Sequence, residues 1–391
     1  MNILYIWDAD YPWDIRVEKI CMSLTRHGHV VHIAARNLKM LDQYELIKGM
    51  HVHRLKAWKN KKINYALSFP AFFSPIWKYF LDKIIIKHDI DLIIVRDLPM
   101  AIAGISRAKA HKIPIIFDMA EDYVSLVRDI WKHSKFKGLN MIVRNPYLAK
   151  LVEKYTFKNI DHVLVVIEEA VDVVINGGGD NGRITIVANT PNYPIKNELE
   201  CDIDINIDKS KYNVIYTGGI QLGRGIQTVF DAIPEIVKSI PNFNLTLIGD
   251  GYATKLLQEQ VILKKLQKYV TWIGWIDHKY IYRYIQLCDV GVIPHFTSDH
   301  VNTTIPNKIF DYMACGLPVI VSDAKPMKRI VNDENCGESF EAGNASDFAK
   351  KLIYMSSANI DYGNNGKLAI EKKYNWGIEE TRLINVVKSC K

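Results

Sequence analysis

The sequence predicts an α/β protein made of two Rossmann-like, doubly wound domains. Short apolar runs alternate with amphipathic helical patterns along the 391 residues, which is typical of the βαβ units of parallel sheets. The pattern is interrupted by a turn-rich and then acidic stretch at residues 190–212, after which it restarts. Because single cores stop growing well before this length, two domains of similar size are expected.

The first domain is expected over residues 1–190. It opens with the apolar run NILYIW, and Asp14 is a candidate cap for a helix in which apolar residues recur at helical spacing. Gly28 ends that helix. Further strands are expected at residues 29–35, 91–95, 113–118 and 162–167.

A linker at 191–212, a second domain at 213–374 and a C-terminal helix at 375–391 are expected next. The strands of the second domain are predicted at residues 213–218, 245–250, 270–275, 290–294 and 318–323. In open parallel sheets, ligands sit beyond the carboxyl ends of the strands. The loops that directly follow these strands are therefore the candidate functional segments.

The composition is that of a globular protein, with 48% apolar and 24% charged residues. Six cysteines without a C-x-x-C pair argue against disulfides and structural zinc. The first residues lack a basic region followed by an apolar core, so no secretion signal is expected. The longest uncharged stretch, residues 63–77, is too short and too rich in proline to span a membrane. A cytoplasmic protein is expected.

The net charge of +7 lies in the first half of the chain. Residues 1–190 hold 27 Lys and Arg against 20 Asp and Glu, and the remainder holds 23 of each. Part of the excess precedes an aromatic segment, which suits peripheral attachment to an anionic membrane surface, here the inner face of the plasma membrane. A solvated helix face over buried aromatics explains the pattern equally well. The residues concerned are Lys56, Trp58, Lys59, Lys61, Lys62, Phe69, Phe72, Phe73 and Trp77.

A glycine-rich loop follows the first strand of the second domain. In TGGIQLGRGIQ, Gly218 and Gly219 let the backbone approach a ligand closely, and Arg224 stands just before a helix. Backbone N–H groups at a helix start together with a guanidinium suit a diphosphate. The next strand ends in LIGDG, with Gly249 and Asp250, for which a plain turn is an adequate explanation.

Two further loops of the second domain carry candidate ligand contacts. Trp275 and Ile276 follow a predicted strand and could face a nucleobase. In TTIPNKIFDYMACGLPVIVSD, Lys308 and Asp311 are three residues apart at the opening of a helix, so they share one face. The lysine can meet a phosphate, and the carboxylate can accept from ribose hydroxyls.

These segments resemble the donor-binding region of the GT4 group of retaining glycosyltransferases, which have the two-domain GT-B fold. The resemblance is most specific in Pro306 to Val319 and extends to the glycine-rich loop and LIGDG. Segments of the first half resemble other parts of that group, and the closing YNWGIEETRLINVVK is similar to a C-terminal helix that returns to the first domain. The first-half segments are DIRVEKICMSLTRHGHVVHIAA, VRDLPMAIAG and FDMAEDY.

The resemblance implies two domains facing a cleft and a UDP-, GDP- or dTDP-sugar donor. It implies that Arg224 and Lys308 are the catalytic cations on the diphosphate and that Asp311 holds the ribose, with no metal and no cofactor. The other donor-binding residues implied are Gly218, Gly219, Gly249, Asp250, Trp275, Ile276 and Thr304. The acceptor-side residues implied are Trp13, Asp14, Arg96, Asp97 and Glu121.

The chain departs from the group's pattern at several places. Asp311 stands for the later of two common glutamates, Arg224 for the usual lysine, and the glycine-rich first loop is replaced by residues 11–14. Thr303 stands where a glutamate is common, Gly219 where an arginine is often found, and Arg96 where a histidine is frequent. The acceptor is expected to be a hydroxyl of a glycan, a lipid-linked or a protein-linked molecule in cell-envelope synthesis, and no nucleic acid is expected.

Three other functions compete with the transferase. A nucleotide-dependent dehydrogenase requires a G-x-G-x-x-G turn followed by an acid, and neither half of the chain fits that pattern. A sugar-nucleotide epimerase of the same fold would need no acceptor. A non-catalytic sugar-nucleotide-binding partner of an active transferase is favoured by the missing carboxylate at Thr303.

Overall fold

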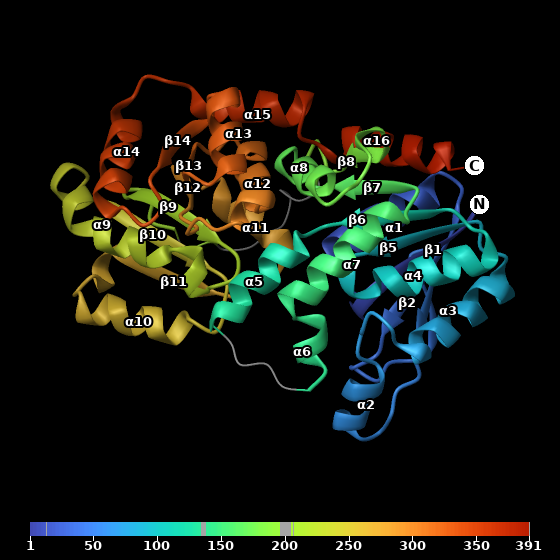
Figure 1. Ribbon diagram of the computed structural model, residues 1–391. Helices are drawn as coiled ribbons and strands as arrows, with labels where there is room; N and C mark the ends of the chain where they lie inside the picture. The colour runs from blue at the N-terminus through green and yellow to red at the C-terminus, as the bar shows by residue number, and fades with distance from the viewer. Residues whose placement is uncertain (13, 134–137, 196–204, 206, 391) are drawn as a thin grey trace. The chain divides into compact units, whose positions relative to one another are not determined.

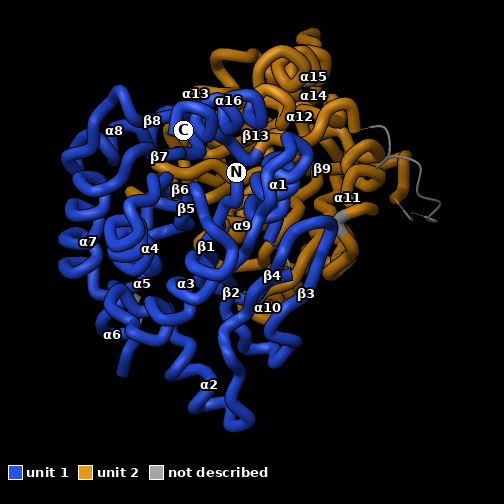
Figure 2. The backbone as a smooth tube through the Cα atoms, turned by 90° about the vertical axis from the view of Figure 1, so that its right-hand side faces the viewer, with its two compact units in different colours: residues 1–189, 379–391 blue, residues 190–378 orange. Residues whose placement is uncertain are grey.

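The computed structural model describes residues 1–12, 14–133, 138–195, 205 and 207–390. The chain divides into two compact units, residues 1–189 with 379–391 and residues 190–378 (Figure 2). The expected first domain ends at residue 190, and the first unit ends one residue earlier. The described part of the expected linker belongs to the second unit. Each unit is built on a mainly parallel sheet, as predicted.

The first unit contains an eight-stranded sheet in the order β3-β4-β2-β1-β5-β6-β7-β8, of which Figure 1 labels all but β3 and β4 and Figure 2 labels every strand. All of its strand pairs are parallel except the β3–β4 pair. The strands are β1 (Asn2–Asp10), β2 (Val30–Arg36), β3 (Tyr44–Ile47), β4 (Met50–Arg54), β5 (Leu92–Arg96), β6 (Ile115–Met119), β7 (His162–Val165) and β8 (Ile184–Ile186).

Burial explains which of these strands the sequence predicts. All residues of β5 and β6 are buried, because helices cover both faces of a parallel sheet, and such strands read as continuous apolar runs. Strands β3, β4 and β8 were not predicted. β3 is a largely exposed edge strand, β4 alternates apolar positions with histidines, and β8 has only three residues.

The helices of the first unit begin where local capping favours them. The carboxylate of Asp14 accepts from the backbone N–H groups of Arg16 and Val17, at 2.9 and 3.0 Å, so it caps α1 as predicted. A cap of this kind stabilises a helix by about 1 kcal/mol. The helices are α1 (Ile15–Arg26), α2 (Lys61–Leu67), α3 (Pro75–His88), α4 (Leu98–His111), α5 (Tyr123–His133), α6 (Asn140–Val143), α7 (Pro146–Lys158) and α8 (Glu169–Asn176), with a 3-10 turn η1 (Asn181–Arg183).

The second unit contains a six-stranded, fully parallel sheet in the order β11-β10-β9-β12-β13-β14. All five predicted strands are present, and β14 is an addition at the edge. The strands are β9 (Tyr212–Thr217), β10 (Phe243–Ile248), β11 (Val270–Gly274), β12 (Val290–Ile293), β13 (Val319–Ser322) and β14 (Gly337–Phe340).

Helices cover this second sheet, and its core is apolar. Phe230, Ile233, Leu245 and Val292 are fully buried in one cluster. The helices are α9 (Ile226–Ser239), α10 (Thr254–Leu263), α11 (His278–Ile285), α12 (Lys308–Ala314), α13 (Lys325–Glu334), α14 (Ala345–Ser357) and α15 (Tyr362–Lys372), with 3-10 turns η3 (Leu222–Arg224), η4 (Gln267–Tyr269) and η5 (Val301–Thr303).

The last helix, α16 (Trp376–Ser389), joins the first unit from Glu379 onward. The buried carboxylate of Glu379 accepts from the backbone N–H of Ala188 at 3.1 Å. Leu383 and Val387, on the same helix, are fully buried. The predicted return of the C-terminal helix to the first domain is therefore observed.

The aromatic segment proposed for a membrane surface is only partly exposed. Phe69, Phe72 and Trp77 belong to the core, and the indole N–H of Trp77 donates to the carbonyl of Ser68 at 3.2 Å. For these three residues the membrane-facing interpretation was wrong, because each is at most 6% exposed, whereas Phe73 is 59% exposed. Within the described residues, no helix has the length and apolar character needed to cross a bilayer.

Candidate functional site

The order of strands places a topological switch point in the second unit between β9 and β12. From β9 the chain proceeds outward through β10 and β11, and then returns to the other side of β9 with β12. The loops that follow β9 and β12 therefore leave the sheet in opposite directions and open a crevice between them, where ligands bind in folds of this kind.

Two glycines allow the backbone to pack tightly beneath this crevice. A Cβ atom at Gly225 would lie 1.8 Å from the carbonyl oxygen of Pro294, and one at Gly249 would lie 2.0 Å from that of Gly218. Both glycines also have a positive φ, 67° and 131°, which other residues rarely adopt. Tight packing of the loops after β9, β10 and β12 thus depends on these two glycines.

Arg224 and His295 meet at the switch point. Nη1 of Arg224 lies 3.3 Å from Nδ1 of His295, which follows β12. Only 1% of His295 is exposed. Burial lowers the pKa of His295 well below its usual value, and the charges of Lys308 and Arg224 lower it further. The imidazole is therefore uncharged and leaves the positive charge of the guanidinium uncompensated.

Lys308 lies at the start of α12, close enough to Arg224 and His295 to interact with both electrostatically. Its Nζ lies 3.7 Å from the centre of the Tyr216 ring and would be 3.1 Å from a methyl group placed on Gly218. Burial and the Arg224 guanidinium lower the pKa of Lys308, while Asp311 opposes that shift. An anion bound beside Gly218 would favour the charged ammonium.

Asp311 and Tyr312, which are consecutive on α12, contact different elements. The hydroxyl of Tyr282 donates to a carboxylate oxygen of Asp311 at 2.9 Å. The hydroxyl of the buried Tyr312 accepts from the backbone N–H of Thr217 at 2.9 Å. Tyr312 therefore fixes α12 against the end of β9, and this positions both Lys308 and Asp311 at the crevice.

The other candidates of the second unit lie on loops around this cluster. Asp250 accepts from the N–H of Gly251 and the hydroxyl of Thr254, at 2.7 and 2.6 Å, which is the turn that the sequence allowed. Trp275 is 76% exposed after β11, and Ile276 beside it is partly buried. The hydroxyl of Thr304 donates to the carbonyl of His300. Gly219 is exposed, with space around its α-carbon.

The first unit has its own switch point, between β1 and β5, and the acceptor-side candidates meet there. Arg96, at the end of β5, forms an ion pair with Asp14, and its Nε lies 3.4 Å from Oδ2 of Asp97. The guanidinium also lies 4.1 Å from the ring centre of Trp7. Arg96 is thus held by two carboxylates and an aromatic face.

The carboxyl group of Asp97, in this cluster, has a strongly raised pKa. Burial raises the pKa of Asp97 to about 8, and Glu121 adds to the shift while Arg96 opposes it. Asp97 also accepts from the N–H of Ala120 at 3.2 Å, and its backbone has a φ of 57°. Strained, desolvated residues of this kind concentrate at functional sites. Trp13 lies outside the described residues.

Sequence reasoning missed three contributors to the site in the second unit. His295, Tyr216 and Tyr282 come into contact with Arg224, Lys308 and Asp311 only through the fold. The one local signal was that of His295, a polar residue directly after the apolar strand VGVIP.

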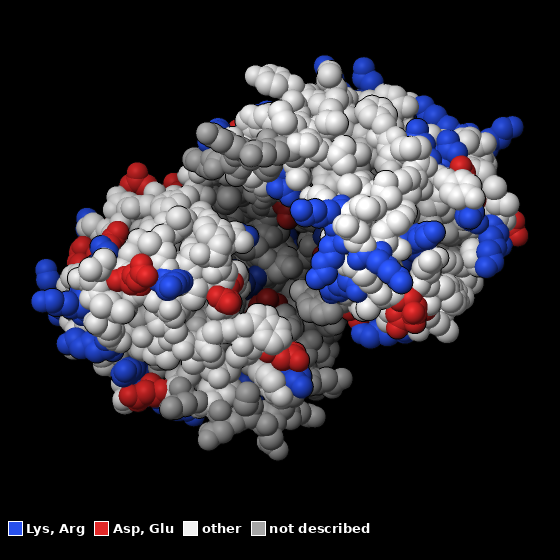
Figure 3. Space-filling model, turned by 90° about the horizontal axis from the view of Figure 1, so that it is seen from below, with Lys and Arg blue, Asp and Glu red and all other residues white. Residues whose placement is uncertain are grey.

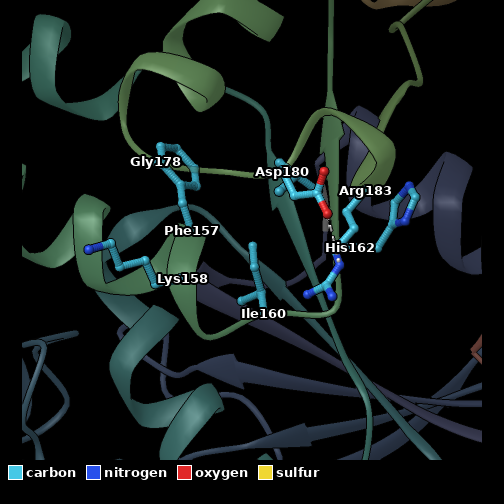
Figure 4. A pocket seen from close by; sticks show the side chains of 8 residues that line it. Phe157, Lys158, Ile160, His162, Gly178, Asp180 and Arg183 are labelled. Carbon is cyan, nitrogen blue, oxygen red and sulfur yellow. Dashed lines mark ion pairs between the residues drawn. The ribbon is translucent and has the colours of Figure 1, made fainter.

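The first unit also has a surface pocket that is separate from the acceptor-side cluster. It has a volume of about 310 Å³ and lies at the amino ends of β7 and β8 (Figure 4). Its lining includes His162, Lys158 and the ion pair of Arg183 with Asp180, at 3.5 Å. None of the predicted site residues lines it.

Two Rossmann-like units, each with charged residues at its switch point, define the class of GT-B proteins. The fold matches that of a sucrose-phosphate synthase from Thermosynechococcus elongatus, with a TM-score of 0.79, 18% identity and coverage of 99% of this chain and 98% of that one. It also matches Anabaena HepE in complex with UDP-glucose, with a TM-score of 0.71, 15% identity and full coverage of both chains.

Sequence comparison gives the family. Residues 15–190 match Glycosyltransferase Family 4, and residues 211–357 match Glycosyl transferases group 1. The chain belongs to this family of group 1 (GT4) glycosyltransferases. A curated relative, the alpha-monoglucosyldiacylglycerol synthase of Acholeplasma laidlawii, is 23% identical over 270 residues, which are 66% of this chain and 64% of that protein. The chain thus spans less than two thirds of this relative's length.

Proposed function

We propose that the protein is a retaining glycosyltransferase that moves a sugar from a UDP-, GDP- or dTDP-sugar to a hydroxyl acceptor. The observation that carries the proposal is the pair of cations at the switch point of the second unit, where Lys308 lies beside Gly218 and Arg224 is close enough to lower the pKa of Lys308. Two cations next to an uncharged His295 suit a diphosphate, which a single carboxylate-paired arginine would not.

The two cations would act on the leaving group. As the bond between the sugar and the diphosphate breaks, negative charge grows on the diphosphate oxygens, and Arg224 and Lys308 would stabilise it. That role is one a metal ion often fills, so catalysis would need no metal. Asp311, held by Tyr282, would accept from the ribose hydroxyls, and Trp275 with Ile276 would contact the base.

The acceptor would bind through the cluster of the first unit. Arg96, Asp97 and Asp14 gather there, with Glu121 close enough to influence Asp97 electrostatically. Charged and polar groups of this density suit recognition of sugar hydroxyls or of a phosphate. The partial exposure of Asp14 leaves the cluster open to a ligand.

We further propose that the acceptor is lipid-linked or cell-envelope material presented at an anionic membrane. Seen from the side of α2, Lys and Arg side chains gather on the first unit (Figure 3). Lys61 and Lys62 are exposed on α2 next to Ile63, which is 48% exposed. The hydroxyl of Tyr65, on the same helix, accepts from the side chain of Asn140 at 3.4 Å.

That last contact brings a second apolar segment beside α2. Around Asn140, the exposed side chains are Leu139, Met141 and Ile142, at 40%, 50% and 44%. Basic residues next to exposed apolar ones favour attachment to an anionic membrane surface. The alpha-monoglucosyldiacylglycerol synthase of Acholeplasma laidlawii has, by its name, a lipid product, which supports this choice of acceptor.

Two experiments test the function. Thermal melting with UDP-, GDP- and dTDP-sugars should identify the donor, because a ligand at 100 times its dissociation constant adds roughly 2.7 kcal/mol to stability. Turnover of that donor is then followed with and without glycolipid and glycan acceptors. Acceptor-dependent release of the nucleoside diphosphate with retention at the anomeric carbon is expected.

The competing functions give different results in the second experiment. Isomerisation of the donor without an acceptor would identify an epimerase. Donor binding with neither reaction would identify the non-catalytic partner that Thr303 favours.

A further inference from the structure

Four histidines from three elements of the first unit come together on one face of its sheet. His32 lies on β2 and pairs in register with His51 on β4. His53 is two residues further along β4, so it points to the same face as His51. His88 is the last residue of α3, and its ring lies 4.4 Å from that of His32. The elements β2, β4 and α3 lie side by side in Figure 2.

Three of these imidazoles have the spacing of a metal site. Nδ1 of His32 lies 3.0 Å from Nε2 of His53, and one ring nitrogen each from His32, His53 and His88 lie within 4.8 Å of one another. With zinc–nitrogen bonds of 2.0–2.1 Å, nitrogens around a tetrahedral ion are about 3.3 Å apart. The 3.0 Å pair is close to that value, and the 4.8 Å limit on the other separations exceeds it by about 1.5 Å, so side-chain movements of up to that size bring the three nitrogens around one ion.

The surroundings favour uncharged imidazoles. Burial lowers the pKa of His32 to about 3 and that of His53 to about 4, and the neighbouring histidines add to both shifts. The uncharged ring is the form that binds metals. His32 is 2% exposed, whereas His53 and His88 are partly exposed and give an ion access from solvent.

Neighbouring groups hold the ligands in place. The side chain of Asn2 donates to the carbonyl of His88 at 2.8 Å, which fixes the end of α3. Nδ1 of His51 lies 2.8 Å from the hydroxyl of Tyr44, and the His51 ring stacks on His32 at 4.8 Å. His51 thus supports the cluster from the side without being among the three closest ligands.

We propose that His32, His53 and His88 bind a borderline transition-metal ion, Zn²⁺ by preference, with water in a fourth position. Three imidazoles without a carboxylate suit zinc, nickel or copper and disfavour magnesium and calcium. The ion would tie α3 to β2 and β4. The acceptor-side cluster follows the carboxyl ends of β1, β5 and β6. His88 is held by Asn2, which lies at the amino end of β1. Because the histidines are tied to the opposite end of this strand, the ion has a structural role and not a catalytic one.

The cysteine spacing argued against a structural zinc site with cysteine ligands. The proposed site uses histidines alone, so it does not require a cysteine motif. Its ligands are 21 and 35 residues apart along the chain, a spacing without a local motif. Only the pairing of β2 with β4 and the packing of α3 bring the rings together.

The test is zinc binding by the full chain without an affinity tag, since histidine tags bind the same ions. After equilibrium dialysis against Zn²⁺, metal analysis should find about one ion per chain. His53→Gln and His88→Gln should weaken binding at least about 100-fold, the upper end of what loss of a supporting residue costs. His162→Gln and His27→Gln are matched controls that should bind as the wild type does, because His162 contacts Thr185 and His27 contacts Ser23 and Glu380, outside the cluster.

A second measurement is independent of stability. Co²⁺ in place of Zn²⁺ should give the visible absorption of a four-coordinate ion in the wild type and in both control variants. That absorption should be absent from His53→Gln and His88→Gln, with circular dichroism confirming that both variants are folded. Wild-type protein that binds no zinc, or ligand variants that bind as much as the controls, would overturn the proposal.

Discussion

Nη1 of Arg224 lies 3.3 Å from Nδ1 and 3.5 Å from Nε2 of the buried His295. Because the imidazole is uncharged, it holds the guanidinium in place without neutralising it. A carboxylate in the same place would cancel the charge that an anionic ligand needs. The contact between Arg224 and an uncharged His295 therefore keeps the switch point of the second unit cationic, and Lys308 supplies a second cation there.

Loss of either cation should lower turnover without unfolding the protein. For Arg224→Ala and Lys308→Met, we expect kcat to fall by roughly 10²- to 10³-fold, the usual effect of removing a charge-stabilising group. Methionine keeps much of the lysine volume against Tyr216. The control is Lys264→Ala, at an exposed ion pair with Asp231. Wild-type rates in both site variants would contradict the proposed role of the cations.

Donor binding should take up protons at a pH where the free Lys308 is deprotonated. In the free protein the pKa of Lys308 is lowered by burial and by Arg224, so the ammonium loses its proton more readily than usual. A diphosphate raises that pKa again, so UDP affinity should decrease as pH rises through the pKa of the free protein. Titration calorimetry of UDP in buffers of different ionisation enthalpy measures the uptake.

Two variants assign those protons. Lys308→Met should abolish the proton uptake that belongs to the lysine. His295→Asn should instead remove any uptake seen below the ordinary histidine pKa of 6.5, because the lowered pKa of His295 would also rise beside an anion. Tight UDP binding by the wild type with no proton uptake at any pH would show that Lys308 does not face the diphosphate.

Turnover should persist in EDTA. The charge on the leaving diphosphate is assigned to Arg224 and Lys308, so chelation should leave kcat within about twofold, since no Lewis acid is removed from the reaction. Chelation would also empty the histidine site, so the assay is run well below the melting temperature. Activity that disappears with EDTA and returns with manganese or magnesium would refute metal independence.

The first unit should bind anionic membranes reversibly. Each basic residue near an anionic leaflet contributes about 1 kcal/mol, so the double variant Lys61→Glu/Lys62→Glu should pellet several-fold less with phosphatidylserine liposomes at low salt. Lys264→Glu, in the second unit, is the control. Equal pelleting with neutral liposomes, or none at low salt, would leave a water-soluble acceptor as the remaining choice.

Part of the candidate site could be read from the order of residues. Gly218, Arg224, Lys308 and Asp311 follow predicted strands, and parallel strands bring such loops to one edge of a sheet. The partners of these residues could not be predicted in the same way. His295 and Tyr282 lie 71 and 29 residues from the side chains they contact, and no local pattern encodes contacts over such separations.

The sequence by itself determined the two doubly wound units, most of their strands and the loops that carry the candidate site. These follow from local periodicity, because strands buried on both faces must be apolar throughout. Only the tertiary structure decided that Phe69, Phe72 and Trp77 are core residues, and that three distant histidines form a cluster. Burial and contact depend on which surfaces pack together. The same apolar or imidazole side chain can be buried in one fold and exposed in another, so its residue type alone does not decide.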